Sequence, residues 1–165
     1  MSALLGLLLA IGLPGCRKDL ADEVPELSQG LQHPDPDERY TAVSSLGRLG
    51  ADAKKAVPAL TEALKDKDAN VRMAAAYALP KIGPEALEAI PALVAAADDP
   101  APLVRSAVVY ALSVMAGDTA SVRTALQKAQ RDPDETVRKD AAEAVRRLEN
   151  RLKYEQKAAA KSKSP

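Results

Sequence analysis

The chain repeats itself every 33 residues, and this period limits the possible folds more than any other feature of the sequence. At this shift an arginine recurs at Arg39, Arg72, Arg105 and Arg138, and a large apolar residue recurs at Leu46, Leu79, Leu112 and Val145. A period of this length is typical of arrays in which each short unit packs against its neighbours. The sequence therefore predicts an elongated fold built from similar units.

Each unit shows the pattern of two helices. In the second unit, Val71, Ala75, Leu79 and Ile82 have the spacing of one helical face. The polar stretch 65–68 before them suits the turn between the two helices. The chain has no Trp and no Phe, and its frequent alanines let helices approach closely. These features predict an all-α fold, a right-handed α-solenoid of helix pairs.

The period also predicts how the chain is divided. We expect a signal peptide at 1–15, a tether at 16–23, and repeats at 24–50, 51–83, 84–116 and 117–152, the last with a C-terminal cap. Residues 153–165 are basic and poor in apolar side chains, so we expect this tail to be disordered.

An acidic and a basic residue recur within each of the later units. An Asp in the turn is followed by a Val-Arg pair that opens the second helix, at Asp66 with Arg72, Asp99 with Arg105, and Asp132 with Arg138. This pattern resembles HEAT repeats, in particular the short bacterial type also found in phycobilisome lyases. The resemblance implies that these six residues form a structural ladder that holds the turns in register.

The first residues have the features of an export signal. The segment 3–15 carries no charge, and at about 1.5 Å per residue it is too short to span a hydrocarbon core of about 30 Å. It ends in Leu13-Pro14-Gly15-Cys16, which is similar to the lipobox of bacterial lipoproteins. The resemblance implies a lipid on Cys16 and a membrane-anchored protein of the bacterial envelope, facing the periplasm or the cell surface. The alternative is a soluble cytoplasmic protein with a chance apolar leader.

Three tyrosines and a methionine mark the candidate binding surface. Tyr40, Met73, Tyr77 and Tyr110 fall on the second helices, roughly opposite the predicted core face, and Tyr77 and Tyr110 are one repeat apart. Exposed Tyr commonly anchors protein interfaces, which favours a protein partner. The alternative is that these rings fill gaps between adjacent second helices.

The sequence shows no catalytic constellation. It has one His and one Cys, and His33 among nearby carboxylates is a weak metal signal without a second spaced pair. The net charge is zero, which gives no case for nucleic-acid binding. We therefore predict a non-enzymatic protein-binding or scaffold module with no cofactor and no metal. The alternatives are a phycobilin-lyase-like or other enzyme-accessory protein and a soluble adaptor; the partner and the oligomeric state stay open.

Overall fold

The computed structural model describes residues 20–115 and 119–162, and within these ranges the chain is helical without strands. The α-helices are α1 (Val24–Gly30), α2 (Pro36–Leu49), α3 (Val57–Ala63), α4 (Ala69–Ile82), α5 (Ile90–Ala96), α6 (Pro102–Met115), α7 (Ala120–Ala129) and α8 (Glu135–Ser162). The described ranges also contain the 3-10 helices η2 (Leu20–Glu23), which precedes α1, η3 (Gly50–Ala56) and η4 (Pro84–Ala89). Cys16 and the predicted signal peptide lie outside the described residues.

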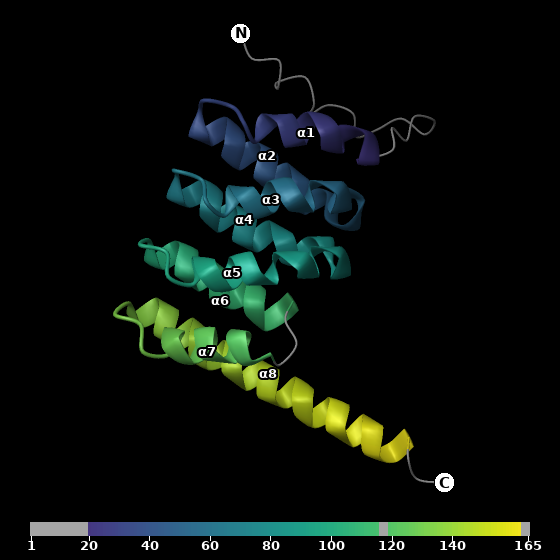
Figure 1. Ribbon diagram of the computed structural model, residues 1–165, viewed down its shortest axis with the longest axis vertical. Coiled ribbons are helices and arrows are strands. Elements are labelled where there is room, and N and C mark those ends of the chain that lie inside the picture. Colours follow the sequence, from purple (N-terminus) through teal and green to yellow (C-terminus); the bar gives the residue numbers. More distant parts are fainter. Residues whose placement is uncertain (1–19, 116–118, 163–165) are drawn as a thin grey trace.

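The helix pairs stack along the long axis of the molecule (Figure 1). The second helices of successive units, α2, α4, α6 and α8, pack directly on one another, and each first helix packs against the second helix of its own unit. The prediction of an all-α solenoid is confirmed.

Aspartates set the starting points of most second helices. The Asp68 carboxylate accepts hydrogen bonds from the backbone amides of Asn70 and Val71 at 2.8 and 3.3 Å, and Asp35 and Asp134 cap α2 and α8 in the same way. Such caps satisfy amide groups that have no acceptor in the first helical turn. Because these three aspartates lie at one register of the repeat, the second helices begin at equivalent positions.

The first helices of the two middle units each consist of two consecutive segments. Each begins as a 3-10 segment, η3 or η4, and becomes α-helical only at Val57 or Ile90. Pro58 and Pro91 follow at once and occupy the first α-helical turn. Proline lacks the amide hydrogen that an interior helical position would donate, so the α-helix begins where that loss is harmless.

The second helices contribute a column of apolar side chains to the core. Leu46, Leu79 and Leu112 are fully buried, whereas Val145 at the same register is half-buried on α8, the last helix that the structure describes. Small residues bring the helices together: a Cβ atom added to Gly47 would lie 3.0 Å from the Cβ atom of Ala78. The alanine-rich composition thus allows the helices to pack closely.

Two glycines end the second helices of the first two units. Gly50 and Gly83 adopt φ angles of 57° and 96°, which other residues rarely adopt, and the chain reverses there. Glu149 holds the same register in the last unit, and α8 runs through it to Ser162, projecting beyond the stack (Figure 1). The disorder predicted from residue 153 therefore differs from the structure, since Lys, Glu, Gln and Ala in this stretch favour helix over coil. No helix in the described part of the chain is both long and apolar enough to cross a membrane.

Candidate functional site

An ion-pair ladder runs along the turns between first and second helices. In each step an arginine donates two hydrogen bonds to the aspartate of the following unit, at 2.6–2.9 Å, and these pairs are Arg39–Asp66, Arg72–Asp99 and Arg105–Asp132. The same guanidinium also donates to two backbone carbonyls of its own turn; Arg72, for example, contacts the oxygens of Asp66 and Lys67. Each arginine thus ties its own turn to the next one, by a planar fork that matches a carboxylate.

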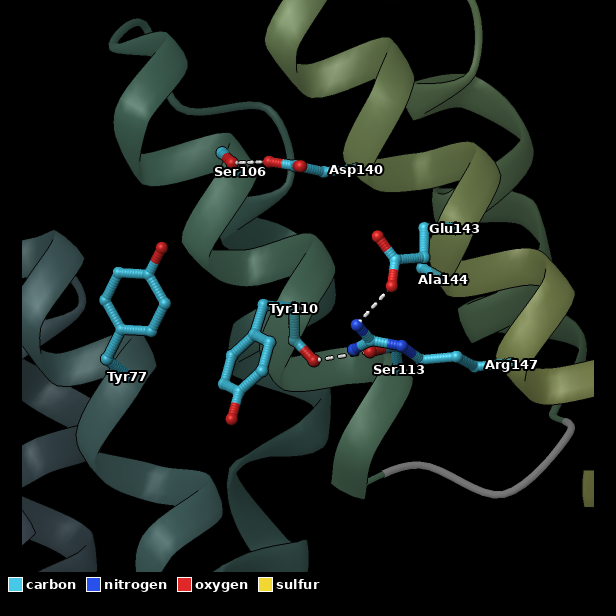
Figure 2. A pocket seen from close by; sticks show the side chains of 8 residues that line it. All are labelled: Tyr77, Ser106, Tyr110, Ser113, Asp140, Glu143, Ala144 and Arg147. Atoms are coloured by element: carbon cyan, nitrogen blue, oxygen red, sulfur yellow. Dashed lines mark hydrogen bonds and ion pairs between the residues drawn. The ribbon is translucent and has the colours of Figure 1, made fainter.

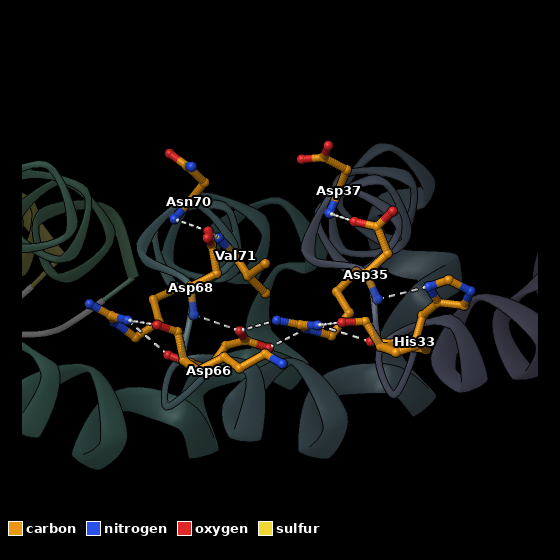
Figure 3. A network of polar contacts seen from close by, with 11 residues as sticks. His33, Asp35, Asp37, Asp66, Asp68, Asn70 and Val71 are labelled. Carbon is orange, nitrogen blue, oxygen red and sulfur yellow. Dashed lines mark hydrogen bonds and ion pairs between the residues drawn. The ribbon is translucent and has the colours of Figure 1, made fainter.

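The aspartates of the ladder also shape their own turns. Asp66 accepts a hydrogen bond from the amide of Asp68 at 2.8 Å (Figure 3). Asp99 and Asp132 accept from the amides of Ala101 and Asp134 in the same way. In the first unit His33 takes this place, and its Nδ1 atom accepts from the amide of Asp35 at 3.2 Å. His33 therefore makes the turn contact of the missing aspartate, but it receives no arginine from a preceding unit within the described residues.

The ladder ends at Arg138. This guanidinium donates to the carbonyl oxygens of Asp132 and Pro133, as the earlier arginines do in their own turns. No carboxylate within the described residues meets its remaining nitrogens. The structural role that the sequence predicts for the ladder residues stays a prediction, which substitutions at Asp99 can test.

The environment of the ladder aspartates holds them charged. Burial raises the pKa of Asp66 and Asp99, but hydrogen bonds from Arg39 and Arg72 and from the backbone outweigh it, so each pKa lies below its ordinary value. For Asp132 the hydrogen bond from Arg105 is the largest cause, and that pKa is lowered too. The side chains of these aspartates are 12%, 7% and 9% exposed, so solvent screens the pairs only weakly.

We expect the fold to lose stability in acid through this ladder. A carboxyl group with a lowered pKa in the folded state contributes stability above its unfolded pKa of about 3.9, and that contribution is lost as the pH falls through the lower folded value. The free energy of unfolding in urea should therefore start to fall near pH 4 and continue to fall below it. Asp99→Ala should show a smaller loss on acidification than the native chain, whereas equal losses would contradict a role for this pair.

A small pocket lies where three second helices meet, between α4, α6 and α8 (Figure 2). Its volume is about 130 Å³. It is lined by Tyr77 from α4, by Ser106, Tyr110 and Ser113 from α6, and by Asp140, Glu143, Ala144 and Arg147 from α8. The rings of Tyr77 and Tyr110 are tilted by 49° with centroids 5.5 Å apart, and each residue is 38% exposed.

The charged groups of the pocket come from α8. Asp140 accepts a hydrogen bond from the hydroxyl of Ser106, and Glu143 forms an ion pair with Arg147. Burial raises the pKa of Tyr77, and the nearby charge of Asp140 raises it further. The pocket thus combines two aromatic rings with one carboxylate that is paired to a cation and one that has no cationic partner among the residues that the structure describes.

The structure brings together only part of the predicted surface. Tyr77 and Tyr110 line the pocket, whereas Tyr40 is exposed on α2 and Met73 is half-buried against the core, both outside it. The sequence reasoning did not single out Asp140, Glu143 or Arg147. The repeat register carried a signal for one of them, because Glu143 lies 33 residues after Tyr110.

The comparisons with known proteins agree with the repeat architecture. The family described as HEAT repeats matches residues 24–113 and again residues 84–146. A comparison with curated proteins finds no significant relative. Among solved structures, the complex of CpcE and CpcF of phycocyanin lyase from Nostoc sp. is similar with a TM-score of 0.66, at 20% identity over 76% of this chain and 84% of that chain. An engineered protein is similar with a TM-score of 0.60, at 24% identity over 78% and 63% of the two chains.

One likeness corrects an expectation from the sequence. Human deoxyhypusine hydroxylase, solved with glycerol, is 31% identical over 77% of this chain, with a TM-score of 0.63. That protein is an enzyme, and this finding contradicts the prediction of a non-enzymatic chain, because helical repeats of this kind also occur in enzymes. This chain spans 43% of the length of the hydroxylase chain.

Within the described ranges, no group of three or more His, Cys, Asp or Glu side chains could hold a metal ion.

The family assignment rests on the repeats themselves. The two matched ranges together run from residue 24 to residue 146, which is more than half of the chain. The chain belongs to the HEAT repeat family.

Proposed function

We propose that this chain is a protein-binding module whose partner contacts the pocket between α4, α6 and α8. The observation that carries the proposal is that three successive units contribute to one pocket with two exposed tyrosines. Tyrosine supplies a large, rigid contact area and is enriched among residues that dominate binding energy. At about 130 Å³ the pocket is smaller than the 300–1,000 Å³ typical of small-molecule sites, which favours one side chain of a protein partner.

We further propose that the module is a lipoprotein of the bacterial envelope, tethered through Cys16. The support is the sequence alone, the apolar segment that ends in Leu13-Pro14-Gly15-Cys16. Mass spectrometry of the protein from its own cells tests this part separately. A lipid-modified Cys16 at the new N-terminus is the expected result, and an intact Met1 with an unmodified cysteine would overturn it.

Loss of both pocket tyrosines should strongly weaken partner capture. In the full chain, Tyr77→Ala combined with Tyr110→Ala is expected to weaken crosslinking to the partner at least tenfold, since each ring is exposed enough to act as an interface anchor. Crosslinked partners are measured by quantitative mass spectrometry, and circular dichroism checks that the helix content is unchanged.

The matched control is Tyr40→Ala, which removes a tyrosine of similar exposure, 41%, outside the pocket. It should leave capture unchanged. If the double variant loses its helix content, the rings serve packing between α4 and α6, and the binding proposal is overturned. Equal loss of capture in Tyr40→Ala would also contradict it.

The likeness to deoxyhypusine hydroxylase favours a second candidate, a role within an enzyme or as an accessory to one. It rests on 31% identity over 77% of this chain. The identity of the crosslinked partner separates the two candidates. An enzyme whose kcat changes when the purified chain is added would support the accessory role, and an unchanged kcat would leave plain binding.

A further inference from the structure

The chemistry of the pocket suggests what kind of side chain it takes; this inference rests on the proposed function. We propose that the pocket binds the guanidinium group of an arginine presented by the partner protein. The inference depends on the volume of the cavity, on the charges that line it and on the placement of its two aromatic rings.

The pocket contains a carboxylate that can accept a further hydrogen bond. Asp140 accepts a hydrogen bond from the neutral hydroxyl of Ser106, and no cationic side chain within the described residues pairs with it. Its side chain is half-buried, so its charge is screened less than that of an exposed group. A second oxygen therefore remains open to a donor that enters the pocket.

The side chains that line the pocket carry unequal numbers of negative and positive charges. The lining holds two carboxylates, Asp140 and Glu143, against one guanidinium, Arg147. Arg147 is already engaged by Glu143 through a single i, i+4 ion pair. The pocket is left with one negative charge in excess, which attracts a cation and repels an acidic side chain.

The two aromatic rings of the pocket also favour a cation. The faces of Tyr77 and Tyr110 carry partial negative charge, and a cation within about 6 Å of a ring centroid is attracted to it. The rings lie 5.5 Å apart, so one group entering beside them can reach both. Figure 2 shows the rings on neighbouring helices, with Asp140 and Glu143 on the adjoining one.

Arginine fits this combination better than lysine does. A guanidinium is planar, stacks on aromatic faces and presents several N–H donors in a fixed fork, so it can contact a ring and a carboxylate at once. An ammonium is a compact, strongly hydrated charge that gains less from a flat aromatic wall. The volume of about 130 Å³ suits one such side chain rather than a folded cofactor.

The aromatic composition of the chain gives a direct test. The protein has four Tyr, one His and no Phe or Trp, so its aromatic NMR spectrum is sparse. The full chain is titrated with N-acetyl-L-arginine amide, and in parallel with N-acetyl-L-citrulline amide, which has nearly the same shape but no charge. We expect saturable shifts at Tyr77 and Tyr110, with a Kd on the order of 1 mM for one isolated side chain, and at least tenfold weaker binding of the citrulline probe.

Substitutions test which residues bind the arginine probe. Asp140→Asn should weaken arginine binding about tenfold, because it removes the charge while keeping the shape and a partner for Ser106. Asp37→Asn, an exposed aspartate of α2 outside the pocket, should leave binding unchanged. The Tyr ring signals of each unliganded variant report whether it is folded.

Several results would overturn the inference. These are equal binding of the arginine and citrulline probes, unchanged binding in Asp140→Asn, shifts of Tyr40 and Tyr154 as large as those of the pocket tyrosines, or no saturable shift at all. The two proposals fail separately: partner capture that depends on Tyr77 and Tyr110 without arginine binding sinks only this inference. Loss of tyrosine-dependent capture sinks the proposed function.

Discussion

Asp99→Ala is expected to lower the free energy of unfolding by about 2–3 kcal/mol. The substitution leaves the guanidinium of Arg72, only 12% exposed, without its carboxylate, and it removes the acceptor for the amide of Ala101. Stranding a largely buried charge costs far more than losing a surface ion pair. Urea unfolding followed by circular dichroism at pH 7 measures the change.

The neighbouring residue provides the control. Asp98 pairs with Lys128 between exposed side chains, 64% and 67% accessible, so Asp98→Ala should cost at most about 1 kcal/mol. The two variants differ by one position in the chain and by the burial of the pair. Equal losses in the two variants would show that the ladder contributes no more than an ordinary surface contact.

Leu79→Ala is expected to lower the free energy of unfolding by about 3 kcal/mol, and it has the largest single effect that we predict. Leu79 is fully buried on α4, the second helix that packs against both α2 and α6. Removing its side chain leaves a cavity in the middle of the stack, and coupling between neighbouring repeats spreads the loss to the adjoining units.

Urea unfolding again measures this change, with Leu87→Ala as the matched control. Leu87 lies in η4 and is 45% exposed, so its truncation should change the free energy by less than about 1 kcal/mol. A loss below 1 kcal/mol in Leu79→Ala would mean that the alanine-rich core collapses around the gap.

The repeat period was enough to predict the architecture. Leu79 and Arg72 each belong to a set of residues spaced one repeat apart. The members of each set have the same surroundings in every inner unit, and such positions keep the same residue type. The start of the second helices was also predictable, because an Asp before an apolar helical pattern is a local capping signal. The local sequence did not show that the 3-10 segments η3 and η4 precede α3 and α5, the helices whose first turns contain Pro58 and Pro91.

The pocket was only half predictable. Tyr77 and Tyr110 stood out as repeats of one another, but Asp140 and Arg147 read as ordinary charges on the polar face of a long helix. These two residues contribute to the pocket only because α8 lies close to α6, and helix packing sets that distance. Function was less predictable still, since the absence of a catalytic motif suggested a non-enzyme and the likeness to a hydroxylase contradicts that reasoning.

The unlike ends of the ladder give the stack a polarity. If two copies met head to tail, Arg138 of one copy would approach His33 of the next, where an inner unit would present an aspartate. The Nδ1 atom of His33 already accepts the amide of Asp35, so a neutral ring carries its hydrogen on Nε2. Donor would then face donor, so this contact would lack the carboxylate acceptor that joins one unit to the next within the chain.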